Sequence, residues 1–378
     1  MRCELSDICV YRNERISTNA LNSHTYVSTE NMLPDKGGIT DAASLPTVSQ
    51  TSKFRYGDTL VSNIRPYFKK IWFAEYDGGC SNDVLAFSAK EGVDPKYLYY
   101  VLANDSFFAY STATSKGTKM PRGDKTSIMQ YQIEKVDSPT QKKIAAILSA
   151  LDEKIATNRA INDNLLEQMQ AIYKSWFVDY LPFGGEMPES WTQTDIYSLA
   201  NIIYGAPFAS KQFNTEGSGK PIIRIRDLKD QQFATYTTEV HPKGYLLRPG
   251  DIVVGMDGEF RPYIWGNDEA WLNQRVCVFE NKRPKGKAFL YFTIKPLLYA
   301  IEQTQVATTV IHIGKKDYDA FEIMLPDDAT LDSFDSLTAP MIMQIVSNSF
   351  ENKRLAAMRD ALLPKLMSGE IDVSAVQL

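Results

Sequence analysis

The chain repeats itself with a period of about 190 residues, and this repeat constrains its fold more than any single motif does. Matching segments follow one order in both copies at nearly one offset. The pairs are Leu5-Ser6 with Tyr197-Ser198, Gly57-Asp58 with Gly250-Asp251, Arg65-Pro66-Tyr67 with Arg261-Pro262-Tyr263, Asn82 with Asn273, Val84 with Val276, Phe87 with Phe279, and residues 97–102 with residues 289–294. The alternative is coincidence among common Gly-Asp and aromatic patterns. Because chance rarely produces matches in one order, we predict two similar domains.

Each copy begins with a globular part. Short β-branched and aromatic runs alternate with Gly, Pro, Asn and Asp, a pattern typical of an α+β domain with a twisted sheet. Residues 84–87 and 275–279 are predicted strands. Helices are predicted to begin near Tyr97 and Phe289.

Each copy ends with a long helix. No Pro or Gly interrupts residues 140–180, and apolar residues recur three and four positions apart. These seam residues are Ile144, Leu148, Leu151, Ile155, Leu165, Met169, Ile172 and Trp176. Such spacing is typical of a coiled coil.

Asparagines complete this seam. Asn158 and Asn162 lie between Ile155 and Leu165, and an offset of 190 leads to Ile345, Asn348, Asn352 and Leu355 in the second copy. Two helices with matched seams are expected to form an antiparallel coiled coil. Buried Asn pairs would specify its register, because a slipped pairing leaves amides unsatisfied. The alternative is that these Asn side chains face solvent.

The predicted fold class is therefore α+β, with two similar globular domains separated by two long helices in a pseudo-twofold repeat. The expected boundaries are 1–137 for the first domain, 138–181 for the first helix, 182–326 for the second domain and 327–378 for the second helix. The first helix should end before Pro182, and the second near Ser368-Gly369 with a kink at Pro364. A helix of about 40 residues spans roughly 60 Å, so the pair could act as a ruler between sites on neighbouring DNA turns.

Two stretches resemble a known family. Residues 138–155 (Ser-Pro-Thr-Gln-Lys-Lys-Ile through Leu-Asp-Glu-Lys-Ile) resemble the central conserved region of the specificity (HsdS) subunits of type I restriction–modification systems, and so does the following stretch from Asn158-Arg159 to Lys174-Ser175-Trp176-Phe177. Residues 355–371 resemble that family's distal conserved region. The globular parts are similar only loosely, as expected of regions that vary with the DNA target.

The resemblance implies a non-catalytic, sequence-specific DNA-binding subunit with two target-recognition domains. Each domain would read one half of an interrupted motif in double-stranded DNA. The helices would space the domains and dock two methyltransferase subunits, which hold S-adenosylmethionine and methylate adenine N6. Two restriction subunits using ATP and Mg²⁺ can join such a complex. No cofactor is expected on this chain itself, and the expected location is the cytoplasm. The alternative is a two-domain coiled-coil scaffold that binds proteins instead of DNA.

Motifs for catalysis are absent from the sequence. There is no Asn-Pro-Pro-Tyr or Asp-Pro-Pro-Tyr tetrapeptide of an adenine methyltransferase, and residues 217–221 lack the first Gly and the Ser/Thr of a phosphate loop. The three histidines have no metal-ligand spacing, and the four cysteines have no CxxC spacing. Asp152-Glu153-Lys154 is interpreted as an exposed charge run. The sequence contains no run of about 18 apolar residues, so no membrane span is predicted. We therefore predict no catalytic or metal site.

The net charge is −5, and −4 of it lies in residues 327–378. The rest is nearly neutral, so DNA contact requires local basic clusters, and partners would supply part of the grip on the phosphates. In the first domain, residues 115–125 combine four basic residues with Gly and Pro. The candidate DNA-binding residues here are Lys116, Thr118, Lys119, Arg122 and Lys125, with Arg65, Lys69 and Lys70. The alternative is an ordinary basic surface loop.

The second domain offers a less basic counterpart, rich in amides and hydroxyls that can bond adenine or contact a thymine methyl. Its candidates are Gln305, Thr308, Thr309, Lys315 and Lys316, with Arg261 and, on one side of an expected strand, Arg224 and Arg226. For each single residue, phosphate contact or plain solvation is an alternative to base readout.

Overall fold

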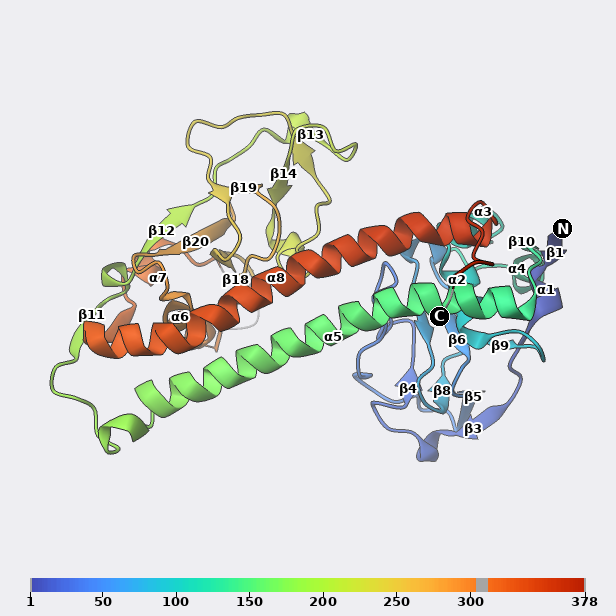
Figure 1. The fold of residues 1–378 in the computed structure, drawn as a ribbon, viewed down its shortest axis with the longest axis horizontal. Helices are drawn as coiled ribbons and strands as arrows, with labels where there is room; N and C mark the ends of the chain where they lie inside the picture. The colour runs from blue at the N-terminus through green and yellow to red at the C-terminus, as the bar shows by residue number, and fades with distance from the viewer. Residues whose placement is uncertain (1, 304–311, 377–378) are drawn as a thin grey trace. The chain divides into compact units, whose positions relative to one another are not determined.

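The computed structural model describes residues 2–303 and 312–376. Two compact units divide the chain (Figure 1): unit 1 comprises Met1–Lys154 and Leu355–Leu378, and unit 2 comprises Ile155–Arg354. Both boundaries fall inside long helices, so each unit holds one globular domain with part of each helix.

Unit 1 contains three small sheets, ordered β2-β9-β6-β7, β3-β5-β8-β4 and β1-β10. The helices α2, α3 and the first part of α5 cover the first sheet, around buried Phe87, Leu98, Phe107 and Leu148. The bounds are β1 Arg2–Glu4, α1 Leu5–Ile8, β2 Cys9–Tyr11, β3 Arg15–Ser17, η1 Thr18–Ala20, β4 Tyr26–Val27, β5 Gln50–Phe54, β6 Thr59–Ser62, η2 Pro66–Phe68, β7 Ile71–Phe73, β8 Gly78–Cys80, β9 Val84–Ala89, α2 Pro95–Ala103, α3 Asp105–Ala113, α4 Lys125–Met129, β10 Gln132–Glu134 and α5 Ser138–Phe177.

Unit 2 contains sheets ordered β12-β20-β17-β18, β13-β15-β14-β19-β16 and β11-β21. Its core joins the first of these sheets to α6, α5 and α8 through Phe279, Phe289, Met169 and Phe334. The bounds are η3 Leu181–Phe183, β11 Thr192–Asp195, η4 Ile196–Ser198, β12 Ala200–Tyr204, η5 Ser210–Gln212, β13 Phe213–Asn214, β14 Lys220–Ile223, η6 Ile225–Asp227, β15 Tyr236–Thr237, β16 Leu246–Leu247, β17 Ile252–Gly255, β18 Pro262–Ile264, β19 Ala270–Leu272, β20 Val276–Asn281, α6 Lys287–Gln303, α7 Lys315–Tyr318, β21 Glu322–Leu325 and α8 Asp328–Met367.

The predicted repeat is confirmed by the sheets. The order β12-β20-β17-β18 repeats the order β2-β9-β6-β7, and a parallel pair recurs as β4-β8 and β14-β19. The predicted strands near Val84 and Val276 are β9 and β20, and the helices predicted near Tyr97 and Phe289 are α2 and α6. Two copies of one α+β architecture therefore stand in the chain.

The repeated Gly-Asp motif is a structural turn. Asp58 accepts a hydrogen bond from the Arg55 amide at 2.8 Å, and Asp251 accepts one from the Arg248 amide at 2.8 Å. The preceding glycines have φ values of 86° and 84°, a region that side chains rarely adopt. The motif thus recurs because both domains need the same left-handed turn before a central strand.

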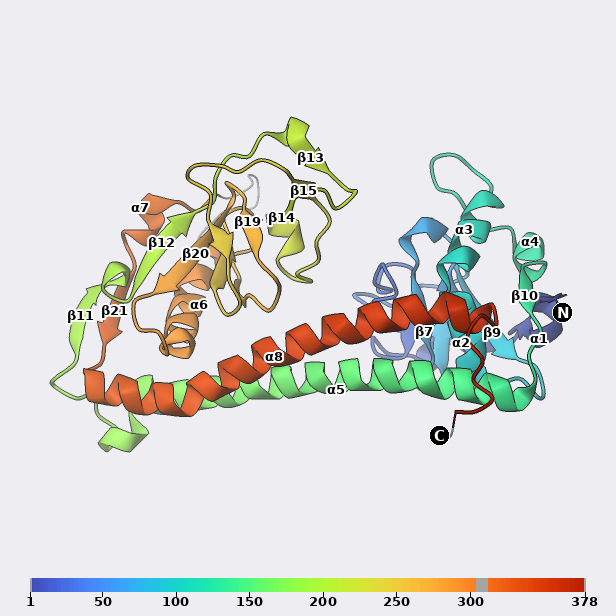
Figure 2. The ribbon, with the colours of Figure 1, turned by 45° about the horizontal axis from the view of Figure 1, so that its top comes forward.

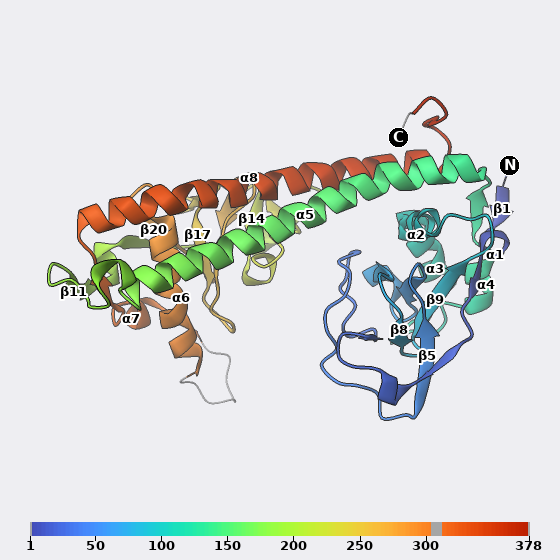
Figure 3. The same cartoon turned by 60° about the horizontal axis from the view of Figure 1, so that its bottom comes forward.

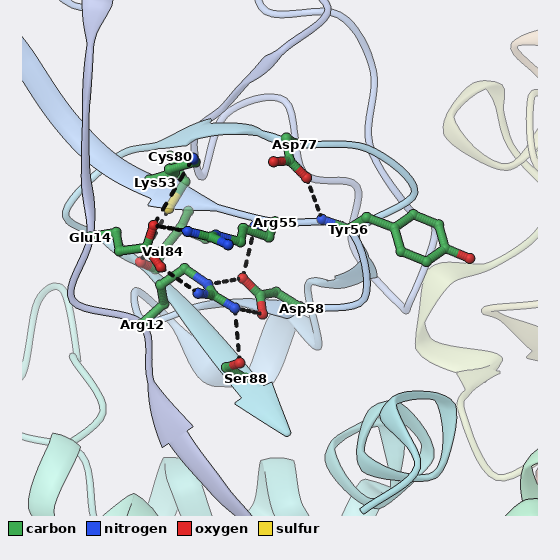
Figure 4. Close-up of polar contacts among 10 residues, drawn as sticks. All are labelled: Arg12, Glu14, Lys53, Arg55, Tyr56, Asp58, Asp77, Cys80, Val84 and Ser88. Atoms are coloured by element: carbon green, nitrogen blue, oxygen red, sulfur yellow. Dashed lines mark hydrogen bonds and ion pairs between the residues drawn. The ribbon is translucent and has the colours of Figure 1, made fainter. Parts of the chain in front are cut away.

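In unit 1 this turn is the centre of an ion-pair cluster (Figure 4). Arg12 Nη2 donates to Asp58 Oδ1 at 2.8 Å and to Ser88 Oγ at 2.9 Å. Glu14 bridges Arg12 and Arg55, at 2.7 Å from each. Since Asp58 is almost fully buried and each guanidinium has a carboxylate partner, these charges tie strands together and are internally compensated.

One predicted match between the repeats is wrong. Arg65-Pro66-Tyr67 was paired with Arg261-Pro262-Tyr263, but Pro66 begins the 3₁₀ helix η2, whereas Pro262 begins strand β18. The strand registers pair Val61 with Ile71 and Val254 with Pro262. Ile71 is therefore the counterpart of Pro262, and the shared tripeptide is a coincidence across connections of different length.

In each unit, part of α5 lies beside part of α8 (Figures 2 and 3), and the helices are antiparallel. In unit 2, Asn158 Nδ2 donates to Asn352 Oδ1 at 2.9 Å and to Glu351 Oε2 at 2.7 Å. Asn348 Nδ2 donates to Asn162 Oδ1 at 2.8 Å. Asn158 and Asn348 are buried, so the alternative in which these side chains face solvent does not hold.

The remaining seam candidates line the same helix pair: Ile155 and Ile345 are buried, while Leu165 and Leu355 are partly buried. In unit 1 the prediction that Asp152-Glu153-Lys154 is an exposed charge run is wrong for Asp152. Asp152 accepts hydrogen bonds from Arg359 Nη1 and Tyr100 Oη, each at 2.7 Å. Its carboxylate faces α8 and α2 because both offer donors there.

Candidate nucleic-acid interface

The connection between α3 and α4 forms a projecting hairpin-like loop (Figure 2). Its base is closed by two backbone hydrogen bonds between Lys116 and Arg122, of 2.8 and 2.9 Å, and Gly117 has a φ of 95°. The predicted residues Lys116, Thr118, Lys119, Arg122 and Lys125 are all exposed. The loop therefore presents side chains that can reach a phosphate backbone.

The loop after β6 lies against this hairpin. Ile64 forms a β-bridge with Arg122, and the Arg65 amide donates to the Pro121 carbonyl at 2.8 Å. Predicted residue Arg65 is exposed beside the hairpin. The structure thus brings together two segments that lie about 55 residues apart in the sequence.

A third loop, which the sequence did not indicate, joins them. The Asp35 amide donates to Phe68 O at 2.8 Å, and the Lys36 amide donates to Lys69 O at 2.9 Å. We call the resulting surface the basic loop cluster, and its members are Lys36, Arg65, Lys69, Lys116, Lys119 and Arg122. Lys36 lies in a Pro-Asp-Lys-Gly-Gly segment, a turn signal that could have drawn attention to it.

Carboxylates hold several of these cations. Lys116 pairs with Asp124, whose pKa is lowered to about 2, mainly by that hydrogen bond. Arg122 lies 3.1 Å from Asp83, and Lys69 lies 2.9 Å from Asp105. The acids fix the cations in place and reduce the net positive charge of the cluster, so its unaided affinity for DNA is expected to be modest.

Predicted residue Lys70 points inward instead. Its Nζ donates to the Thr29 carbonyl at 2.6 Å, and burial lowers its pKa. Lys70 therefore anchors the third loop and is not part of the basic loop cluster.

The backbone of these loops is unusual. Among the described residues, six that are not glycine have a left-handed φ, and four of them are Asp35, Lys36, Arg65 and Lys69. Each such residue costs of order 1 kcal/mol, and backbone strain of this kind gathers at functional sites. Most of the left-handed backbone outside glycine in the described residues therefore lies in these two adjoining loops.

One contact of this surface recurs in unit 2. A β-bridge joins Asp257 to His312, and the Ile313 amide donates to Met256 O at 2.9 Å, as Gly123 donates to Asn63 in unit 1. His312 Nδ1 lies 2.8 Å from Asp257 Oδ1, and Arg275 lies 3.7 Å from that carboxylate. The predicted residues Gln305, Thr308 and Thr309 lie outside the described residues.

The other candidates in unit 2 are scattered. Arg224 and Arg226 do not share a strand face, so that prediction is wrong. The Asp227 carboxylate accepts a hydrogen bond from the Arg224 amide at 3.0 Å. This contact caps the 3₁₀ helix η6, which begins at Ile225, just after β14 ends at Ile223. The Arg224 guanidinium bonds Thr235, while Arg226 is exposed.

Arg261 is paired with Glu302, whose hydrogen bonds raise the pKa of Arg261. Lys315 lies 2.7 Å from Asp319, and Lys316 is exposed on α7. Arg261 is therefore held against α6 by an ion pair, while the two lysines lie on the surface just after the loop.

The described parts of the chain contain neither a metal-ligand cluster nor a helix suited to a membrane. No group of three or more His, Cys, Asp or Glu side chains is placed to hold a metal ion within residues 2–303 and 312–376. In the same ranges, no helix has the length and apolar character needed to cross a membrane.

Comparison with known proteins identifies the family. The profile of the type I restriction modification DNA specificity domain matches residues 2–167 and again residues 188–344. The HindI specificity subunit of Haemophilus influenzae is 25% identical over 97% of this chain and 98% of its own length. The EcoBI specificity subunit of Escherichia coli is 38% identical over 36% of this chain, which corresponds to 29% of that relative.

A solved structure has the same fold. The crystal structure of a type I restriction–modification S subunit from M. genitalium superposes with a TM-score of 0.56 at 15% identity, covering 97% of this chain and 96% of that chain. The double profile match covers most of the sequence and coincides with the two repeats. The chain therefore belongs to the type I restriction–modification specificity family and is the DNA specificity subunit, the non-catalytic subunit, of such a system.

Proposed function

We propose that each unit reads one half of an interrupted motif in double-stranded DNA, unit 1 through the basic loop cluster. The observation that carries this proposal is the duplication. Ile64 with Arg122, and Asp257 with His312, form β-bridges at equivalent positions of the two repeats. Two copies of one DNA-binding architecture would give two recognition events, and their different loop sequences would give two different half-sites.

The helices α5 and α8 would dock the catalytic partners. We propose two methyltransferase subunits, which would hold S-adenosylmethionine and modify adenine N6, joined by up to two restriction subunits that use ATP and Mg²⁺. Such complexes act on chromosomal DNA, so the proposed location is the cytoplasm. No chemistry is assigned to this chain's own residues, whose part is to bind DNA and place the partners over it.

The proposal is tested by mapping adenine methylation in host DNA with the gene intact, deleted, or carrying residues 1–137 of a relative. Deletion should abolish methylation at one two-part motif. The exchange should alter one half of that motif and leave the other half and its spacer unchanged. Altered recognition in both halves would contradict the assignment of one half-site to each unit.

Reversing charge in the hairpin should remove DNA binding by the complex. With Lys116, Lys119 and Arg122 all changed to Glu, three phosphate contacts are lost and three repulsions replace them. The slope of log binding constant against log salt concentration should fall by about 3, and affinity should fall roughly 100-fold or more at low salt.

A charge-matched control replaces three exposed or partly exposed lysines of unit 1 outside the cluster: Lys53, Lys90 and Lys135. This variant should bind DNA within about threefold of the unaltered complex, because long-range charge effects are screened by salt. Equal losses in both variants would mean that net charge, and not the hairpin, governs binding.

A further inference from the structure

Two exposed aromatic side chains form the tip of the loop after β6. Tyr67 is 48% exposed and Phe68 is 39% exposed, and their ring centroids lie 4.7 Å apart. They sit in the single turn η2, next to Pro66, which is buried. The two adjacent rings form a small exposed apolar patch beside basic side chains, and apolar patches with a polar rim are typical of interaction sites.

The backbone holds this aromatic tip rigidly. Arg65 and Lys69, on either side of the turn, both have a φ of 50°. Inside the turn, the Phe68 amide donates to Arg65 O and the Lys69 amide to Pro66 O, each at 2.9 Å. The loop containing Lys36 adds two hydrogen bonds from outside. The rings are therefore preorganised, so little conformational entropy would be lost on binding.

Positive charge flanks the tip. Lys36 Nζ lies 2.9 Å from Asp105 Oδ1, and Lys69 Nζ lies 2.9 Å from Asp105 Oδ2. One carboxylate thus positions two ammonium groups and leaves the trio with one net positive charge. The Lys69 side chain is 33% exposed and can meet an approaching phosphate, whereas the Lys36 side chain is only 14% exposed and serves to hold Asp105 in place.

The surroundings select nucleic acid as the occupant. Arg65, at the base of the turn, is joined to the hairpin of Lys116–Arg122 because its backbone amide donates a hydrogen bond to the Pro121 carbonyl. Apolar rings beside fixed cations match a DNA groove, where apolar side chains contact thymine methyl groups or lean between base steps while lysines hold the adjoining phosphates.

We propose that Tyr67 and Phe68 enter a groove of double-stranded DNA and contact the base edges of the half-site read by unit 1, with Lys69 on a flanking phosphate. This inference rests on the proposed function, in which unit 1 reads one half-site. It assigns base discrimination to the aromatic turn, while the basic hairpin would bind the DNA phosphates and so position the DNA backbone.

The test uses the assembled methyltransferase complex with Tyr67→Ala and Phe68→Ala together. Binding is compared on the intact motif and on DNAs with single mismatches in either half. The ratio between intact and mismatched DNA should fall by roughly tenfold in the half read by unit 1. Discrimination in the other half should not change, and neither should the melting temperature of the complex, because both rings are exposed.

Tyr56→Ala is the matched control. Tyr56 is 69% exposed and lies in the turn before β6 (Figure 4), at the opposite end of that strand from the aromatic tip. Its loss should leave discrimination in both halves unchanged.

Other outcomes overturn the inference. Equal weakening on all sequences would mean that the rings only support backbone contacts, and unchanged discrimination would remove them from the interface. If the double variant fails to fold, Tyr67→Ser alone carries the same test. Failure of the unaltered complex to prefer the motif over mismatched DNA would instead count against the proposed function.

Discussion

Replacing Asp152 by alanine is expected to lower the free energy of unfolding of unit 1 by about 2 kcal/mol. The Asp152 carboxylate joins three helices, since its oxygens accept from Arg359 of α8 and Tyr100 of α2, each at 2.7 Å. Tyr100 is 2% exposed. Removing the acceptor leaves a buried hydroxyl and a partly buried guanidinium without this partner. The loss is below the full cost for a buried ion pair because Arg359 also contacts Asp360.

The charges in this contact support one another. Burial works against the charged guanidinium of Arg359, but the Asp152 carboxylate outweighs that effect and raises its pKa. Burial, and then the same carboxylate, raise the pKa of Tyr100, so the hydroxyl remains a donor at every pH at which the protein would be studied. Arg359 and Tyr100 therefore both keep the protons that they donate to Asp152.

Hydrogen exchange followed by mass spectrometry measures the effect locally. Amides of α2 and the first part of α5 should exchange roughly 30-fold faster in the Asp152→Ala variant, as expected for 2 kcal/mol. Asp163→Ala, an exposed carboxylate on the same helix, should change exchange rates by less than about twofold. Adding Arg359→Met to Asp152→Ala should restore part of the loss, since the partly buried guanidinium is then removed and the remaining Asp360 carboxylate is exposed to water. A double variant less stable than the single one would contradict this account.

The fold could be predicted from sequence where periodicity carried the information. A matched offset of 190 locates both long helices, because seam residues such as Asn158 and Asn348 recur only in a helical register. The Gly-Asp turns were visible for a similar reason: only glycine adopts their left-handed φ easily. Both signals are local in the chain, and the structure contains both.

Contacts between distant segments could not be predicted. Lys36 and Lys69 come from two separate loops and Asp105 from the start of α3, yet all three meet in one ion-pair group. No regular spacing in the sequence connects them. Asp152 looked like surface charge because its partner Arg359 lies 207 residues away. The mistaken match of Arg65-Pro66-Tyr67 arose because loops differ in length between the repeats, which strand pairing reveals and a fixed offset does not.

Lengthening both helices by one heptad is expected to abolish methylation at the original motif. The insertions belong at the boundaries between the two units along the chain, after Lys154 in α5 and before Leu355 in α8. Seven residues add about 10 Å to each helix, roughly three base-pair steps at 3.4 Å. Within each unit, the pairs Asn158–Asn352 and Asp152–Arg359 remain together. The change therefore acts on the connection between the units and leaves each DNA-binding surface intact.

Three base pairs also rotate DNA by about 100° about its axis. Seven residues complete almost two full turns of an α-helix and fall short of them by only about 20°. Distance and rotation therefore cannot both be restored by a longer spacer, and loss of methylation is the expected result. Any new motif should contain the original half-sites with a spacer about three base pairs longer. Methylation sequencing of cells carrying the variant distinguishes these outcomes.

Two controls separate spacing from stability. Replacing residues 155–161 by another heptad that retains Ile155 and Asn158 keeps the length, and the motif should be unchanged. Inserting the heptad in α5 alone leaves α8 too short to follow it, so either the Asn158–Asn352 pair or the Asp152–Arg359 pair must separate. That variant should be less stable than the doubly lengthened one, because buried amides or charges lose their partners. If the complex that contains the doubly lengthened chain still methylates the original motif at full level, the helices do not set the spacer, and each unit must find its half-site independently of helix length.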